Sequence, residues 1–243
     1  MTLIEHLSEL RNRLFIVMGA VALGAVGGWF LYAPVFRFLR QPFCDFMVDH
    51  PQLAINPTDP CRLVYSTPTE PFLLKIKVVL FLGLAIALPI VLYELWRFVT
   101  PGLTQRERRY AIPFVVSSVF LFILGAAFAF WTLPRALNFL LGFAGTEGFV
   151  AALSIDKYIG FTLLVMLAFG LSFEFPVVLI SLTMVGVLSS RQLAHWRRYA
   201  ILFIAVAAAV ITPSQDFVTM TAMMVPLIVF YELSIWISRA LKR

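Results

Sequence analysis

One stretch of the sequence, residues 94–109 (ELWRFVTPGLTQRERR), gathers side chains that could bind a charged partner. It lies between two long apolar segments and contains a Pro-Gly break, so we expect a loop at a membrane boundary. Glu107 stands there among Arg106, Arg108 and Arg109, which makes it an anionic point within a cationic rim. A carboxylate in this position favours a partner that brings its own positive charge, because the planar guanidinium of arginine binds carboxylates in a bidentate manner.

Two other carboxylates have unusual surroundings. Glu9 lies in the opening stretch, residues 1–13, whose leucines share one helical face while its glutamates share another, as in a helix resting on a membrane surface. Glu174 is the only charged residue between Lys157 and Arg191, which places it near the middle of an apolar span. A carboxylate there is costly, so by default it is functional or paired. We predict that Glu174 faces a water-accessible cavity; the alternative is a protonated side chain hydrogen-bonded to a serine or threonine on an adjacent helix.

Two of these carboxylates also have a local structural explanation. Glu107 follows Thr104 with the spacing of a capping box, in which it would only complete a helix start. Glu9 can pair with Arg13 four residues later on the helix surface, which would stabilise the helix by about 0.3–0.5 kcal/mol. A functional role for either glutamate therefore needs support beyond its own surroundings.

The composition places the chain in a membrane. Of its 243 residues, 61% are hydrophobic and 13% are charged, with a mean hydropathy of +0.92, whereas a soluble domain carries about 25% charged residues. The formal net charge of +6 does not indicate nucleic-acid binding, because the basic residues cluster at the ends of apolar segments. The chain opens with an amphipathic stretch and not with a short apolar run, so no cleavable signal peptide is expected. The sequence has no glycine-rich phosphate loop, GxSxG motif or closely spaced His and Cys residues, so we expect no cofactor.

The apolar segments predict an all-α, polytopic membrane protein that forms one domain over residues 1–243. One span needs about 20 apolar residues, and six segments meet or approach that length. The fifth and sixth transmembrane helices are expected to be short, because the polar stretch 212–216 interrupts a single apolar run. A first outer loop, rich in proline and aspartate, is expected at residues 37–69, and a first inner loop at residues 94–109.

The basic residues also orient the chain. Most of the 19 Lys and Arg residues fall in the N-terminal stretch, in the second and fourth loops and at the C-terminal end, and such an excess marks the cytoplasmic side. We therefore expect both termini, the amphipathic helix 1–13 and the loop 94–109 in the cytoplasm. The loop 37–69 is then periplasmic if the membrane is a bacterial inner membrane.

The only two cysteines, Cys44 and Cys61, both fall in this predicted outer loop. In an oxidising compartment the pair is a disulfide candidate, and closing a loop of this size would stabilise the fold by roughly 3 kcal/mol. The alternative is two unrelated small side chains, because spacing alone does not fix the geometry that a disulfide requires.

Four motifs together resemble the TatC family, the core receptors of the twin-arginine protein translocase. They are residues 6–14, residues 94–103 with the Glu107-Arg108-Arg109 that follows, residues 169–176 and residues 211–216. The resemblance implies a multi-pass protein of the bacterial inner membrane, a receptor and not an enzyme, that binds the twin-arginine signal peptides of folded cargo. We expect the energy to come from the proton-motive force, since the sequence contains no nucleotide-binding motif. The resemblance also implies the single-span partners TatA and TatB, a homo-oligomeric receptor complex and surrounding membrane lipid.

Residue by residue, the resemblance assigns signal-peptide recognition to Glu9 and Glu107. Glu174 matches a buried polar position on a concave face of the family, and Pro42 and Asp216 match positions on its outer face. The cysteine pair has no counterpart in the family pattern. The further positions that match the surroundings of the recognition site are Leu10, Arg11, Phe98, Pro101, Leu103, Arg108 and Arg109.

Simpler roles stay open for several of these secondary positions. Phe98 and Trp96 can be interfacial aromatic side chains, which is the commonest role of such residues at a membrane boundary. Arg108 and Arg109 can be basic anchors on the cytoplasmic side. Asp216 directly precedes the last helix and can do no more than cap it.

The alternative function is a small ion-coupled transporter that uses Glu174 as a proton site. Such transporters usually consist of related halves with paired broken helices, and residues 1–109 and 110–243 share no such pattern. An intramembrane protease would need a Ser/His, paired-Asp or zinc constellation in its spans, and the sequence has none. Capture of a twin-arginine peptide, lost when its two arginines become lysines, would separate a receptor from both alternatives.

Overall fold

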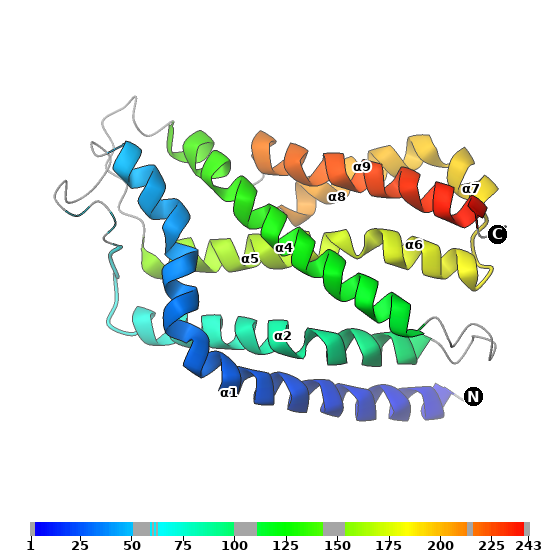
Figure 1. Cartoon of the computed structure of the whole chain (residues 1–243), viewed down its shortest axis with the longest axis horizontal. Coiled ribbons are helices and arrows are strands. Elements are labelled where there is room, and N and C mark those ends of the chain that lie inside the picture. Colours follow the sequence, from blue (N-terminus) through cyan, green and yellow to red (C-terminus); the bar gives the residue numbers. More distant parts are fainter. Residues whose placement is uncertain are drawn as a thin grey trace.

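The structure is a computed structural model that describes residues 3–50, 59, 61, 63–99, 111–142, 154–212 and 216–240. In these ranges it consists of α1 (Leu3–Asp49), α2 (Glu70–Val99), α4 (Ala111–Gly142), α5 (Ile155–Phe173), α6 (Phe175–Met184), α7 (Ser190–His195), α8 (Arg197–Ile211) and α9 (Phe217–Ala240). Between the helices, the described residues form one isolated bridge, from Val64 to Ser154, and no strand. The prediction of an all-α protein is confirmed. Figure 1 shows that α1 begins and α9 ends on the same side of the bundle.

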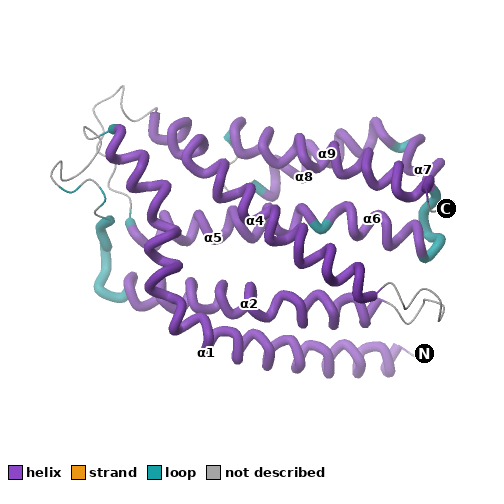
Figure 2. Tube along the Cα trace, viewed as in Figure 1, coloured by secondary structure: helices purple, strands orange, loops and turns teal. Residues whose placement is uncertain are grey.

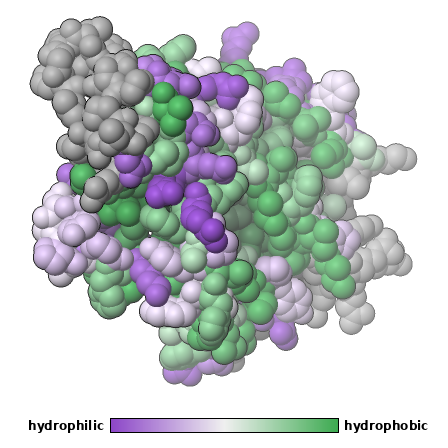
Figure 3. All heavy atoms as spheres, turned by 60° about the vertical axis from the view of Figure 1, so that its left-hand side comes forward, coloured by the Kyte–Doolittle hydropathy of each residue, from purple (hydrophilic) through white to green (hydrophobic). Residues whose placement is uncertain are grey.

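Five helical segments of the described part are long and apolar enough to cross a membrane: Leu7–Asp49, Glu70–Phe98, Ile112–Leu140, Ile155–Met184 and Phe217–Ala240. Large apolar side chains on them remain exposed, such as Phe30 at 78% and Leu23 at 76%, and contiguous apolar surface of this kind marks contact with lipid or protein. In Figure 3 apolar side chains (green) cover much of the face shown, with hydrophilic ones (purple) gathered towards its middle. The chain is a multi-pass membrane protein.

The two helices expected to be short differ from each other. α8 has 15 residues, so it is indeed shorter than a usual span, and the count of six spans stays a prediction. The expectation of a short sixth helix is wrong, since α9 extends over 24 residues. The uncharged run ends before Glu232, but this carboxylate accepts a hydrogen bond from Arg197 of α8 at 2.8 Å and the helix continues past it.

α1 corrects two predicted boundaries. Residues 37–49, expected in the loop 37–69, continue a helix of 47 residues that contains Pro34 and Pro42. The stretch 1–13 is likewise no separate surface helix, because from Leu3 onward it belongs to α1. Proline in a helix interior kinks the helix or breaks it. Figures 1 and 2 show α1 as two legs, the first beside α2 and the second turned across the bundle, without a break in the helix.

The second leg of α1 is helical because one of its faces is buried. Its buried side chains pack with residues of α2, α4 and α5 in a hydrophobic cluster. Tyr158 of α5 adds a hydrogen bond from its hydroxyl to the backbone oxygen of Leu39, at 3.2 Å. The proline content predicted a loop, but the recurrence of apolar residues at helical spacing was the stronger signal. Those buried residues are Leu39, Phe43, Phe46 and Met47.

The first leg of α1 lies against α2 at very short range. A Cβ atom added at Gly24 would stand 2.5 Å from the backbone oxygen of Gly83, and one added at Gly83 would stand 2.8 Å from the backbone of Val21 and Ala25. Only glycine allows two helix backbones to approach this closely. The contact fixes the register in which the start of α1 meets the end of α2.

The fourth apolar segment is interrupted at Glu174, which separates α5 from α6. Pro176 follows in the first turn of α6, where its missing N–H costs nothing. The backbone of Glu174 keeps a helical conformation (φ −71°, ψ −14°), and its N–H still donates to the carbonyl of Leu171 at 3.1 Å. The interruption, visible in Figure 2 as a short teal segment, is therefore a local irregularity within one continuous span.

Candidate functional site

Arg13 joins two carboxylates at the end of the molecule where α1 begins and α2 ends (Figure 1). Its Nη1 donates to Glu94 Oε2 at 2.8 Å, and its Nε donates to Glu9 Oε1 at 3.1 Å. Nη2 makes a further ion pair with the same oxygen of Glu9. One guanidinium thus connects the first leg of α1, through Glu9 one turn earlier, to the last turns of α2.

The cluster of Glu9, Arg13 and Glu94 is largely shielded from solvent. The side chains of Arg13 and Glu94 are 13% and 8% exposed, and that of Glu9 is 23% exposed. Charges removed from water need several good hydrogen bonds to offset the loss of hydration, and the fork of Arg13 supplies them. The trio contains two carboxylates and one guanidinium, and carboxylates held in this way can exchange one arginine partner for another.

A second carboxylate, Glu174, opens into a cavity of about 310 Å³ between α2, α4 and the α5–α6 span. Ser118 of α4 makes a side-chain hydrogen bond with Glu174. Glu174 Oε1 and the indole Nε1 of Trp96 on α2 are both buried and have no hydrogen-bond partner, although buried polar atoms in proteins are nearly always paired. The stacked ring of Phe114, 4.4 Å away, holds Trp96 in place.

This cavity has the form of a binding site. Most of its lining is apolar, and a few convergent polar groups provide one acceptor at Glu174 and one donor at Trp96, which is the usual composition of a ligand pocket. The sequence left two interpretations of Glu174 open, a side chain facing a cavity and a side chain hydrogen-bonded to an adjacent helix. The structure shows a feature of each, because the carboxyl group interacts with Ser118 of α4 and also lines a cavity. The remaining lining residues are Leu92, Leu95, Val115, Leu171, Val177, Val178, Ser181 and Leu182.

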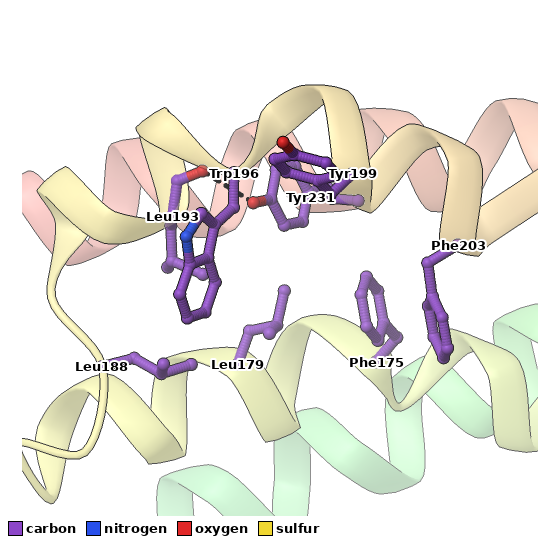
Figure 4. Close-up of a pocket in the computed structure, with 9 residues that line it drawn as sticks. Phe175, Leu179, Leu188, Leu193, Trp196, Tyr199, Phe203 and Tyr231 are labelled. Carbon is purple, nitrogen blue, oxygen red and sulfur yellow. Dashed lines mark hydrogen bonds between the residues drawn. The ribbon is translucent and has the colours of Figure 1, made fainter.

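A larger pocket, of about 370 Å³, lies between α6, α7, α8 and α9 (Figure 4). Figure 4 shows Trp196 and Tyr199 above it and Leu179 and Phe175 below it. The hydroxyl of Tyr231 is already used, since it donates to a backbone oxygen of α7 at 2.7 Å. None of the described residues that line this pocket has a buried side-chain nitrogen or oxygen atom without a partner, whereas the Glu174 cavity has two. The Glu174 cavity is therefore the stronger candidate for recognition of a polar group.

No part of the described chain holds three or more His, Cys, Asp or Glu side chains placed to bind a metal ion. The described side chains of the two carboxylate regions supply ion pairs, hydrogen bonds and apolar surface. This combination fits recognition of a peptide or helix.

Known proteins decide the family. A family model described as Sec-independent protein translocase protein (TatC) matches residues 5–226. The chain belongs to the TatC family. A TatC protein of Aquifex aeolicus is 39% identical over 245 residues, which cover 100% of this chain and 97% of that protein. One of Frankia casuarinae is 38% identical over 239 residues, which cover 97% of this chain but only 65% of the longer relative.

The fold agrees with that assignment. A crystal structure of the twin-arginine translocase receptor TatC matches with a TM-score of 0.77 and 38% sequence identity, covering 98% of this chain and 100% of that one. The resemblance stated from the motifs is thereby confirmed. TatC proteins are components of a protein translocase, so the family is one of transport proteins.

The structure brings together only some of the residues that the TatC resemblance selects. Glu9 lies in the ion-pair cluster, with Leu10 and Arg11 exposed next to it on α1. Phe98 is partly buried in the last turn of α2. The others lie outside the described residues, in 100–110, although α2 and α4 bring the flanking residues to the end of the molecule that carries Glu9 (Figure 1). They are Pro101, Leu103, Glu107, Arg108 and Arg109.

The two positions that the resemblance assigns to an outer face, Pro42 and Asp216, lie in α1 and directly before α9. Asp216 caps α9, because its Oδ1 accepts from the backbone N–H of Thr219 at 2.8 Å and its Oδ2 from the hydroxyl of Thr219 at 2.6 Å. This is the simpler role considered for it. Pro42 is buried within the second leg of α1.

The sequence motifs did not predict the ion pair between Arg13 and Glu94. Glu94 belonged to the predicted loop, but its pairing with Arg13 joins positions 81 residues apart, and no local pattern reports such a contact. For Trp96 the simpler role was that of an interfacial aromatic, and the structure places it in the lining of the Glu174 cavity with its indole Nε1 buried and without a hydrogen-bond partner. The signal that could have found it is the spacing of Leu92, Leu95 and Trp96, which places these residues on one face of α2.

Proposed function

We propose that this TatC-family protein is the receptor that binds twin-arginine signal peptides of folded proteins from the cytoplasmic side of a bacterial inner membrane. The single observation that supports it most is the pair of shielded carboxylates, Glu9 and Glu94, that one guanidinium brings together at the start of α1. A peptide with two consecutive arginines carries the groups that bind carboxylates in a bidentate manner. Family membership supports a translocase function over an ion-coupled transporter.

Recognition proceeds by exchange of arginines at Glu9. In the free protein, Arg13 engages both Glu9 and Glu94. When an arginine of the signal peptide arrives, Glu9 turns to it, and Glu94 keeps Arg13 neutralised. Glu107 receives the second arginine, in agreement with its place in the family motif. The bidentate fork explains a preference for arginine over lysine at both positions.

The ion pairs alone provide specificity and little affinity. An exposed ion pair stabilises by only about 0.2–1 kcal/mol. The remaining affinity comes from burial of the signal peptide's apolar stretch, at about 25 cal/mol per Å². The exposed apolar faces of α1 and α2 next to the cluster offer such a surface, with Leu10, Leu14 and Leu95 on it.

The Glu174 cavity serves a second step. Its unpartnered acceptor and donor suit a polar group carried into the membrane by a helix, either from the inserted signal peptide or from the single-span partners TatA and TatB. Binding there assembles the homo-oligomeric receptor complex and its partners around the cargo, with export driven by the proton-motive force. Six spans with both termini in the cytoplasm, α8 being the fifth, agree with the distribution of basic residues.

The test is photocrosslinking of a twin-arginine peptide, with the reactive group next to its arginine pair, to the full-length protein in membrane vesicles. Glu9→Ala and Glu107→Ala are each expected to lower the crosslinked fraction by up to about fivefold, since each removes one ion pair of about 0.2–1 kcal/mol. The matched control is Glu232→Ala, which removes an ion-paired carboxylate between α8 and α9 and should leave crosslinking unchanged. A peptide with two lysines should behave like the Glu9 variant. Undiminished crosslinking in both glutamate variants would refute the receptor assignment.

A further inference from the structure

The two cysteines of the chain lie in contact at the end of the bundle opposite the Glu9 cluster. Cys44 is in the second leg of α1, and Cys61 is in the connection from α1 to α2. Both are partly buried free thiols, and they lie close enough to interact with each other. No other cysteine exists in the sequence, so each thiol has only one intramolecular partner.

The connection that carries Cys61 is fixed to α5 just beyond the cysteine. The backbone N–H of Ile155 donates to the carbonyl of Val64 at 2.8 Å. Glu70 Oε2 accepts from the hydroxyl of Ser154 at 2.7 Å and from the backbone N–H of Ser66 at 3.1 Å. These bonds hold residues 63–70 against the start of α5, so Cys61 is tied to an anchored backbone.

The other cysteine is fixed to the same helix from the side of α1. Phe43, the residue before Cys44, is buried and its ring packs against that of Tyr158 of α5, with 5.3 Å between the ring centroids. The hydroxyl of Tyr158 also bonds to the backbone of Leu39. The chain on either side of the pair is therefore held against the start of α5 by separate contacts. None of these contacts involves a thiol, so they keep the two cysteines close to each other whether or not a bond forms.

We propose that Cys44 and Cys61 form an intrachain disulfide bond in the native protein. It would clamp the second leg of α1 to the connection that is already held against α2 and α5. The inference goes beyond the recognition function and uses only the orientation proposed above, in which this end of the bundle faces the oxidising side of the membrane.

The bond forms by thiol–disulfide exchange with an extracytoplasmic dithiol oxidant. One thiolate of the pair attacks a sulfur of the oxidant's disulfide, which releases one oxidant thiolate and gives a mixed disulfide. The second thiolate then attacks the protein sulfur of this intermediate and displaces the oxidant. The two cysteines lose two electrons and two protons, and the oxidant's disulfide is reduced to two thiols.

The first experiment counts thiols in the full-length protein taken from native membranes. After an acid quench and denaturation without reductant, a maleimide mass tag should add to neither cysteine, and after reduction it should add to both. Two tags before reduction would overturn the proposal, as would a disulfide-linked dimer on a non-reducing gel. Added to intact cells after reduction, a membrane-impermeant tag should reach both thiols from outside, whereas labelling only from the cytoplasmic side would refute the orientation.

The second experiment measures thermal unfolding with and without reductant. Reduction should lower the Tm of the wild-type protein by roughly 5–10 °C, because it releases a closed loop in the unfolded state. The Tm of Cys44→Ser, Cys61→Ser and the double variant should equal that of reduced wild type and ignore the reductant. An unchanged wild-type Tm would contradict the clamp. Since none of these variants touches the Glu9 cluster, their peptide crosslinking should be normal, and failure of the receptor function would not alter the thiol count.

Discussion

Two regions of this TatC-family protein place carboxylates away from water, and they treat them in opposite ways. At the start of α1 and the end of α2, Glu9 and Glu94 both form ion pairs with the guanidinium of Arg13. In the middle of the α5–α6 span, Glu174 has the hydroxyl of Ser118 and an unpartnered oxygen beside a cavity. Near the membrane boundary the charged group of an arginine can stay partly hydrated while it pairs with carboxylates. In the middle of a span an arginine would lose its hydration, which is costly. In the cluster of Glu9, Arg13 and Glu94 the carboxylates are held by an arginine that a peptide arginine can replace. At Glu174 one carboxyl oxygen is left for a hydrogen bond from a group of a bound helix or peptide.

Both regions depend on a glycine contact. Gly24 and Gly83 let α1 approach α2, as described above. At the other region, a Cβ atom added at Gly125 of α4 would stand 2.6 Å from the backbone oxygen of Phe169 of α5. Each carboxylate is therefore positioned by two backbones in close contact, and the regions differ in the chemistry of their side chains and not in how tightly their helices pack.

The largest loss of stability is expected when Arg13 is removed from the cluster of Glu9, Arg13 and Glu94. Arg13→Ala leaves Glu9 and Glu94 shielded from water with no counter-charge, which should lower the free energy of unfolding by about 3 kcal/mol. Thermal or denaturant unfolding in detergent measures it. The matched control is Arg197→Ala, whose ion pair with Glu232 has side chains 43% and 38% exposed and should contribute less than about 1 kcal/mol. Equal losses in the two variants would show that shielding of the Arg13 cluster has no energetic consequence.

A smaller loss of stability is expected when a side chain at position 24 prevents the close approach of α1 to α2. Gly24→Ala forces a methyl group to within 2.5 Å of a backbone oxygen of α2, and such overpacking should lower the free energy of unfolding by about 2 kcal/mol. The control is Gly19→Ala in the same helix, where an added Cβ atom meets nothing within 4 Å. That change should be neutral or stabilising by up to about 1 kcal/mol, because alanine favours helix. Comparable losses at both positions would argue against a specific α1–α2 contact.

Much of this molecule could be predicted from hydropathy and motifs, because a span is a local property. The apolar segments gave the helical architecture, and Glu174 stood out as the one charge in a long span. The first leg of α1 and its proline-containing second leg were separated wrongly, since Pro42 suggested a loop while its buried neighbours at helical spacing favoured a helix. A proline costs one backbone hydrogen bond, and burial of Leu39, Phe43 and Met47 outweighs it.

The partners of the site residues could not be predicted in the same way. Arg13 was recognised only as a neighbour of Glu9 on the helix surface, and its bond to Glu94 exists because two distant glycines bring α1 and α2 together. The unpartnered indole of Trp96 is likewise a property of three helices at once. Sequence motifs identify which carboxylates are unusual, while packing decides which of them are paired.

The smallest change in stability, with a large change in activity, is expected at Glu174. Glu174→Leu removes a buried oxygen that has no partner and leaves one hydroxyl, of Ser118, without its bond, so the two effects offset each other and unfolding should change by less than about 1 kcal/mol. Export of a twin-arginine cargo should nevertheless be lost, because the cavity no longer offers an acceptor. Glu174→Gln keeps the bond to Ser118 and should retain part of the export.

Two results at Glu174 would break the comparison between the regions. A loss of stability as large as that of Arg13→Ala would mean that this carboxyl group is structurally paired in the membrane. Normal export by a folded Glu174→Leu protein would mean that nothing binds to the open oxygen. If neither occurs, the two carboxylate regions divide the work: the paired cluster selects a cationic peptide at the boundary, and the unpaired acid receives a polar group within the membrane.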